Sequence, residues 1–145
     1  MTLPYTLTVE EHASPEDIQV IHQGLGNYNG QFARNDDFRP LRILVRNQQA
    51  EIVGGLLGFL YWGWLAIDIL WVHEDWRSQG VGSALLAKAE TEARQAGIFR
   101  VHLDTMGFQA LPFYQKHGDT VCGQLDNFIG DYARYYLKKE LTRDM

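Results

Sequence analysis

Short apolar segments alternate with polar, turn-like segments along the chain, and their periodicity predicts a mixed α/β protein. Runs rich in β-branched and aromatic side chains predict about seven strands, at residues 6–10, 41–46, 51–61, 65–72, 99–105, 120–125 and 132–140. Apolar positions at helical spacing predict helices at residues 15–26, 81–96 and 109–117, with a short fourth helical turn near residues 31–34. Ser14, followed by Pro15 and two acids, is typical of a helix start.

The middle of the chain predicts a hairpin, residues 41–46 with 51–61, that leads into a strand buried on both faces, residues 65–72. Glycines inside the hairpin's second strand, among them Gly58, indicate a bulge or a close backbone neighbour. The strand at 99–105 follows a strand–helix unit, so it should lie parallel to 65–72.

Between the strand at 65–72 and the next helix lies a glycine-containing loop that suits a phosphate group. Gly80 and Gly82 remove side chains at a helix N-terminus, whose N–H groups lack partners, and Arg77 adds a positive charge. A P-loop is excluded because no lysine follows Gly82, and a dinucleotide fingerprint because Leu85 replaces its third glycine. The alternative is a strand-to-helix turn with no ligand.

The composition narrows the functional classes. Acidic residues outnumber basic ones 18 to 13, and there is no basic run, so we expect no nucleic-acid partner. The single cysteine, Cys122, excludes an internal disulfide, and we expect no metal. The N-terminus lacks a signal-peptide pattern and no run of 18 apolar residues occurs, so we expect a cytoplasmic single domain, residues 1–145, without a membrane partner.

The glycine loop matches a known family pattern. Arg77-Ser78-Gln79-Gly80-Val81-Gly82 reads Arg-x-x-Gly-x-Gly and resembles the acyl-CoA pyrophosphate loop of the GNAT N-acetyltransferases. Similar pieces occur at residues 54–58, 61–64, 70–72, 103–105, 108–110, 113–118 and 134–141. The resemblance covers nearly the whole chain. It implies the GNAT fold, a mixed, mostly antiparallel sheet whose central parallel pair, the fourth and fifth of seven strands, splays apart.

The resemblance also implies where acetyl-CoA binds. The pantetheine arm would lie in the gap between the splayed strands, and backbone amides of the loop would hold the pyrophosphate. The cofactor-binding residues expected on this basis are Leu70, Trp71, Val72, Arg77, Gln79, Gly80, Val81, Gly82 and Ser83.

Three side chains are candidates for catalysis. By the resemblance, Tyr114 occupies the family's Phe-Tyr position and would protonate the departing CoA thiolate, and the Val72 amide would stabilise the oxyanion. Asp68, a lone acid in an apolar strand, is the candidate base, although it could be satisfied by a neighbouring strand or face solvent. Glu74 is a second candidate. His73 and His117 have suitable chemistry but no matching position, and a water chain could replace any single base.

These observations predict an acetyl-CoA-dependent N-acetyltransferase that acts on a primary amine of a small molecule or peptide by direct transfer in a ternary complex. The alternative is a non-catalytic acyl-CoA-binding or interaction module on the same fold; a nucleotide-phosphate enzyme is weakened by the missing loop lysine. We expect the acceptor to contact residues 27–37, including Asp36 and Asp37, and the strand near Asn127. The resemblance also implies a homodimer.

Overall fold

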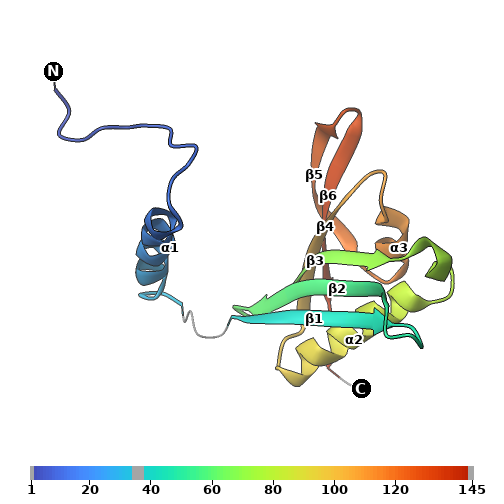
Figure 1. The fold of residues 1–145 in the computed structure, drawn as a ribbon. Helices are drawn as coiled ribbons and strands as arrows, with labels where there is room; N and C mark the ends of the chain where they lie inside the picture. The colour runs from blue at the N-terminus through green and yellow to red at the C-terminus, as the bar shows by residue number, and fades with distance from the viewer. Residues whose placement is uncertain (1, 34–37, 144–145) are drawn as a thin grey trace. The chain divides into compact units, whose positions relative to one another are not determined.

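The computed structural model describes residues 2–33 and 38–143, which divide into two compact units at residues 1–36 and 37–145 (Figure 1). The first unit contains α1 (Pro15–Asn29), which runs three residues past its predicted end. The Ser14 hydroxyl accepts a 3.1 Å hydrogen bond from the Asp17 amide, which confirms the predicted N-cap.

Two expected elements of this first unit are absent from its described residues. Residues 6–10 form no strand, because no described segment pairs with their backbone. Alternating apolar and polar side chains do not make a strand without such a partner. Residues 31–33 form a hydrogen-bonded turn directly after α1 instead of a fourth helix. The predicted acceptor residues Asp36 and Asp37 lie outside the described residues.

The second unit is a six-stranded sheet in the order β1-β2-β3-β4-β6-β5. Its elements are β1 (Arg39–Arg46), β2 (Ile52–Tyr61), β3 (Trp64–Val72), the 3₁₀ turn η1 (Glu74–Trp76), α2 (Val81–Gln95), β4 (Arg100–Met106), α3 (Leu111–Lys116), β5 (Thr120–Ile129) and β6 (Tyr132–Glu140). Every strand pair is antiparallel except β3–β4. The described chain therefore has six strands and three α-helices. The parallel pair consists of its third and fourth strands, not the fourth and fifth of seven.

The hydrophobic core lies between α2 and one face of the sheet (Figure 1). Helix α2 buries Leu85, Leu86, Ala89 and Ala93, all at most 3% exposed. The sheet contributes the fully buried side chains Leu56, Leu60, Leu65, Val101 and Leu137. Burying a leucine or valine stabilises the fold by about 1.5–3 kcal/mol, so this layer fixes α2, and the loop before it, against the strands.

Helix α2 also makes polar links to the part of the sheet that lies beyond β3. The Lys139 ammonium pairs with the Glu90 carboxylate at 2.9 Å, and both side chains are largely buried. The Arg94 guanidinium donates to the Thr142 carbonyl, also at 2.9 Å. These contacts attach the same helix to β6 and to the segment that follows it.

The parallel strands β3 and β4 separate soon after they meet. Their pairing covers only Leu65–Ile67 with Val101–Leu103. Beyond it, β3 stays paired with β2 as far as Val72, and β4 stays paired with β6 as far as Met106. A gap therefore opens in the middle of the sheet, as the splayed pair predicted.

A β-bulge marks the point where the strands separate. Leu57 pairs with Ile69 and Gly58 with Ile67, so Asp68 is an extra residue that faces no partner on β2. A Cβ atom on Gly58 would overlap the Ala66 carbonyl oxygen, so only glycine lets β3 approach this closely. The bulge and close neighbour predicted from the strand glycines are confirmed here.

Candidate active site

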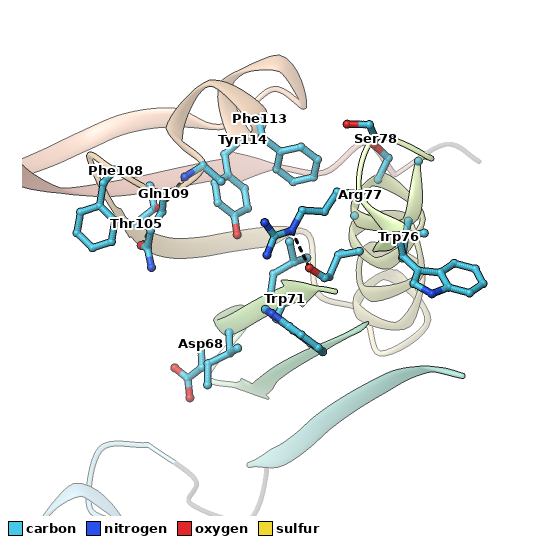
Figure 2. Close-up of a pocket in the computed structure, with 18 of the residues that line it drawn as sticks. Asp68, Trp71, Trp76, Arg77, Ser78, Thr105, Phe108, Gln109, Phe113 and Tyr114 are labelled. Atoms are coloured by element: carbon cyan, nitrogen blue, oxygen red, sulfur yellow. Dashed lines mark hydrogen bonds between the residues drawn. The ribbon is translucent and has the colours of Figure 1, made fainter. Parts of the chain in front are cut away.

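A cavity of about 820 Å³ follows the gap between β3 and β4 and reaches the start of α2 (Figure 2). Most of the residues expected at a cofactor or catalytic site line it: Asp68, Leu70, Trp71, Val72, Arg77, Gly80, Val81, Gly82, Ser83 and Tyr114. Two do not. Glu74 belongs to η1, and Gln79 turns back to donate to the Asp75 carbonyl at 3.1 Å.

The edge of β3 presents backbone hydrogen-bonding groups to the gap. The His73 amide donates to the Val53 carbonyl of β2 at 2.8 Å. In an antiparallel pair successive residues alternate between bonding the neighbour and pointing away from it, so Val72 and Leu70 point their N–H and C=O groups away from β2. Since β4 has already diverged, these groups face the cavity. The Arg77 guanidinium donates to the Val72 carbonyl at 2.9 Å, as the dashed line in Figure 2 shows.

The N-terminus of α2 has no side-chain cap. Gly80 occupies the cap position with φ +80°, and the first intrahelical bond from the Ala84 amide reaches the Gly80 carbonyl at 3.0 Å. The amides of Val81, Gly82 and Ser83 therefore have no intrahelical acceptor. With no acid in the first turn, the helix dipole and these amides favour an anion here.

The two loop glycines serve different purposes. Nothing lies within 4 Å of a Cβ built on Gly80, so this position is open to an approaching ligand. A Cβ on Gly82 would lie 3.1 Å from the Phe113 ring of α3. The sequence analysis attributed both glycines to phosphate access, but Gly82 is also needed for the packing of α3 against α2.

Tyr114 projects its hydroxyl into the cavity from α3 (Figure 2). The residue is only 6% exposed. Burial, assisted by the negative charges of Asp119 and Asp104, raises the pKa of its phenol to about 12. The phenol is therefore protonated at neutral pH and can donate a proton or hydrogen bond.

A histidine ties α3 to the start of α2. The Nδ1 atom of His117 lies 2.8 Å from the Phe113 carbonyl, which can only accept, so Nδ1 carries the proton. In the neutral imidazole, Nε2 is then the acceptor for the Ser83 hydroxyl at 2.8 Å. His117 does not line the cavity; it links the helix that carries Tyr114 to the phosphate-binding turn. The other histidine considered as a base, His73, accepts from the Asp75 amide and caps η1.

The opposite wall of the cavity contains residues to which the sequence analysis gave no role. Asp104 and Thr105 come from the end of β4, and Phe108 and Gln109 from the loop before α3. The Asp104 carboxylate accepts from Arg134 of β6 at 2.8 Å. The signal was present, because the carboxyl ends of parallel strands are where ligands bind in α/β sheets.

Asp68 lies at the rim of the cavity, on the bulge, with an exposed side chain. Asn127, expected near the acceptor, lies in β5 with φ 54° and does not line this cavity. Among the described residues, no helix is both long and apolar enough to cross a membrane.

Comparisons with known proteins agree with this geometry. The Acetyltransferase (GNAT) family profile matches residues 7–119. An acetyltransferase from Agrobacterium fabrum, Atu2258, is 36% identical over 127 residues, which is 88% of this chain and 93% of that protein. A blasticidin-S acetyltransferase from Streptomyces morookaense is 36% identical over 107 residues, which is 71% of this chain and 79% of that protein.

A solved structure extends the similarity to three dimensions. The crystal structure of an acetyltransferase from Bacillus cereus superimposes with a TM-score of 0.83 at 29% identity, covering 92% of this chain and 98% of that one. With the splayed strands, the uncapped helix and the profile match in agreement, the chain belongs to the GNAT acetyltransferase family.

Proposed function

We propose that this protein transfers the acetyl group of acetyl-CoA to a primary amine of a small molecule or peptide, directly within a ternary complex. The observation that carries the proposal is Tyr114, a protonated phenol inside the cavity where two strands have separated. A binding module would not need a proton donor there, so Tyr114 favours the enzyme over a non-catalytic acyl-CoA-binding module. One relative is named a blasticidin-S acetyltransferase, which supports a small-molecule acceptor.

The cavity offers acetyl-CoA two kinds of contact. The pantetheine amides would bind the N–H and C=O groups of Leu70 that point into the gap, replacing the sheet hydrogen bonds that β4 no longer supplies, while the Val72 N–H stays free for the thioester oxygen. The pyrophosphate would bind the amides of Val81, Gly82 and Ser83 at the start of α2. Gln79 would contribute through its backbone only, because its side chain is turned away.

The reaction requires deprotonation of the acceptor amine, stabilisation of the oxyanion and protonation of the leaving thiolate. The acceptor must lose a proton, which costs about 4.6 kcal/mol for an alkyl ammonium of pKa ~10.4 at pH 7. Asp68 at the rim is the proposed base, in direct contact or through water. Glu74, which lies in η1 outside the cavity lining, is the second candidate and would act only through water. The amine nitrogen then attacks the thioester carbon, and the resulting oxyanion accepts from the Val72 N–H. As the C–S bond breaks, the thiolate takes the Tyr114 proton, and the extra proton on the new amide nitrogen leaves through water and restores the phenol.

The first test removes the proton donor and keeps its ring. In Tyr114→Phe, kcat should fall about 10²–10³-fold, because a positioned general acid contributes that much. Affinity for acetyl-CoA, measured by calorimetry, should stay nearly unchanged. The wild type should show no loss of kcat between about pH 8 and pH 11 through this group, since its pKa is raised to about 12.

Tyr61→Phe is the matched control, because Tyr61 does not line this cavity. Thiol release is measured over a panel of amines, including polyamines, aminoglycosides, amino acids and lysine peptides. Binding of acetyl-CoA without turnover on any amine would favour the binding module. Failure to bind acetyl-CoA or CoA would overturn the assignment of the cavity. A homodimer and a cytoplasmic location stay predictions from the sequence.

A further inference from the structure

The cavity has one end that the proposed acetyl-CoA contacts leave unused. The phosphate-binding turn follows the carboxyl end of β3, whereas Asp68 lies four residues before Val72, at the bulge where β3 and β4 separate. The cavity lining that these contacts leave unused includes two aromatic rings and an amide, those of Trp71 on β3 and of Phe108 and Gln109 on the opposite wall. These four residues are here named the bulge-end subsite.

Asp68 supplies a carboxylate without a protein counterion. As the bulge residue it faces no partner on β2, and the β3–β4 pairing has already ended at Ile67. Among the described residues its side chain has no hydrogen bond or salt bridge. Figure 2 shows its carboxylate at the rim.

The other charges near this end are already paired. The Asp104 carboxylate binds Arg134 through two contacts, at 2.9 and 2.8 Å. The same guanidinium stacks on Phe128 and Tyr136, at 4.9 and 5.2 Å from the ring centres. Arg77 lies at the other end of the cavity, where it donates to the Val72 carbonyl. The bulge-end subsite therefore favours a cation and disfavours an anion.

Two aromatic rings line the subsite and are held by neighbouring rings. Trp71 and Phe108 are 45% and 50% exposed, one on β3 and one on the far side of the gap. Trp71 packs edge-on against His73 with centroids 6.0 Å apart, and Phe108 against Tyr132 at 5.1 Å. About half of each residue is exposed, so these rings can contact a planar group, which gains stacking energy beyond simple burial.

Gln109 adds a hydrogen-bond donor of fixed identity. Its Oε1 atom accepts from the Met106 amide at 2.7 Å and from the Thr105 hydroxyl at 3.2 Å. The other branch of the amide is therefore the NH₂ group, which can only donate. A carbonyl or ring nitrogen on a ligand would satisfy it.

We propose that the bulge-end subsite binds the acceptor, and that the acceptor is a cationic amine attached to a planar group that bears a hydrogen-bond acceptor. This inference rests on the proposed function, because it assigns the second substrate of the same reaction. The ammonium lies at Asp68, the planar group stacks on Trp71 and Phe108, and its carbonyl or ring nitrogen accepts from Gln109.

Matched amines test each part of this subsite. The protein saturated with CoA is titrated calorimetrically at pH 7 with 2-phenylethylamine and 2-cyclohexylethylamine, both of which are ammonium ions at this pH. Plain hydrophobic burial favours the larger cyclohexyl group, whereas stacking favours phenyl, so we expect phenyl to bind at least about fivefold more tightly. A carboxamide on the phenyl ring should tighten binding further, and a carboxylate there should abolish it.

Single-residue variants separate the contributions of the aromatic ring, the carboxylate and the amide to amine binding. Phe108→Leu should bring the phenyl-to-cyclohexyl ratio close to one, while Phe128→Leu, outside the cavity, should keep it. Asp68→Asn should weaken both amines at least about tenfold and leave their ratio unchanged, while Asp126→Asn should change neither. Gln109→Leu should remove only the gain from the carboxamide.

The same amines are also tested for acetyl transfer, which separates this inference from the proposed function. Transfer without preference for the planar ring, or a preference that survives in Phe108→Leu, would overturn the subsite and leave the enzyme standing. Ring-selective, Asp68-dependent binding without transfer to any amine would support the subsite and contradict the transfer reaction. Absence of binding by all the amines would overturn the subsite.

Discussion

At the scale of single residues, Asp119 is the polar group that the fold accommodates least well. It immediately precedes β5, is 5% exposed, and its amide donates to the Tyr114 carbonyl at 3.1 Å. One carboxyl oxygen is buried with no hydrogen-bond partner among the described residues. Burial raises the pKa of this carboxyl to about 6, against the opposing charges of Lys139 and His117 and with the support of Glu90.

Asp119→Asn should stabilise the protein in a pH-dependent way. Between the ordinary carboxyl pKa of 3.8 and about 6, the folded state holds a proton that the unfolded state has released. Wild-type stability therefore falls as pH rises through that window, and the whole penalty is present above it. The variant should gain about 3 kcal/mol in urea unfolding at pH 8 and almost nothing near pH 4. A gain that is equal at both pH values, or that also appears in exposed Asp126→Asn, would contradict this account.

Site residues could be predicted from the sequence where their role depends on a local motif, and not where it depends on contacts between distant segments. The glycine loop was predictable from a local pattern at a strand–helix junction, whereas Tyr114 was predicted only from the family resemblance of Phe113-Tyr114. The sequence analysis gave no role to Asp104 or Gln109, because their place in the cavity wall depends on the pairing of β4 with β6. Glu74 follows Val72 closely in sequence, yet η1 carries it out of the cavity lining.

At the scale of elements, the bulge in β3 depends on a glycine in β2. In Gly58→Ala the new methyl group would overlap the Ala66 carbonyl oxygen, which is backbone and cannot move aside as a side chain can. We expect a loss of about 2–4 kcal/mol in urea unfolding, because overpacking against backbone forces the strands apart. Acetyl-CoA affinity should fall as well, since the same bulge positions Asp68 and the edge of β3.

Gly24→Ala is the matched control for that substitution. Gly24 lies within α1, where nothing stands within 4 Å of an added Cβ, so alanine should be neutral or stabilising by up to about 1 kcal/mol. Equal stability of the Gly58→Ala variant and the wild type would show that β3 tolerates a side chain at this crossing, and the bulge would need another explanation.

The positions of individual helices and strands could be predicted better than the number of strands and their order in the sheet. The strand at 132–140 matches β6 at both ends, and the hairpin of β1 with β2 was read from its turn. The alternation at residues 6–10 predicted a strand wrongly, because periodicity reports which side chains could be buried and not whether a partner strand exists. The position of β6 between β4 and β5 depends on long-range pairing that no local pattern records.

At the scale of the whole molecule, ligand binding should be visible as protection of one strand edge. The Leu70 and Val72 amides point into the gap, whereas the Trp71 amide faces its partner Gly55 on β2. Hydrogen exchange followed by NMR should therefore be fast at the first two amides and slow at Trp71 in the unliganded protein. Saturating acetyl-CoA should slow exchange at Leu70 and Val72 at least about tenfold and leave Trp71 unchanged. Protection at these two amides before any ligand is added would contradict an open gap.

The short pairing between β3 and β4 also affects how the two parts of the sheet can move. Three residue pairs join two parts of the sheet, β1-β2-β3 and β4-β6-β5, and we expect any rotation between these parts to pivot at those pairs. A small rotation about a hinge displaces each point in proportion to its distance from the axis. Asp68 lies next to these pairs and would hardly move, whereas Val72 and Met106, the last residues of the separated strands, would move most. One end of the cavity can therefore yield to admit a long, flexible molecule while the other end keeps its shape for chemistry.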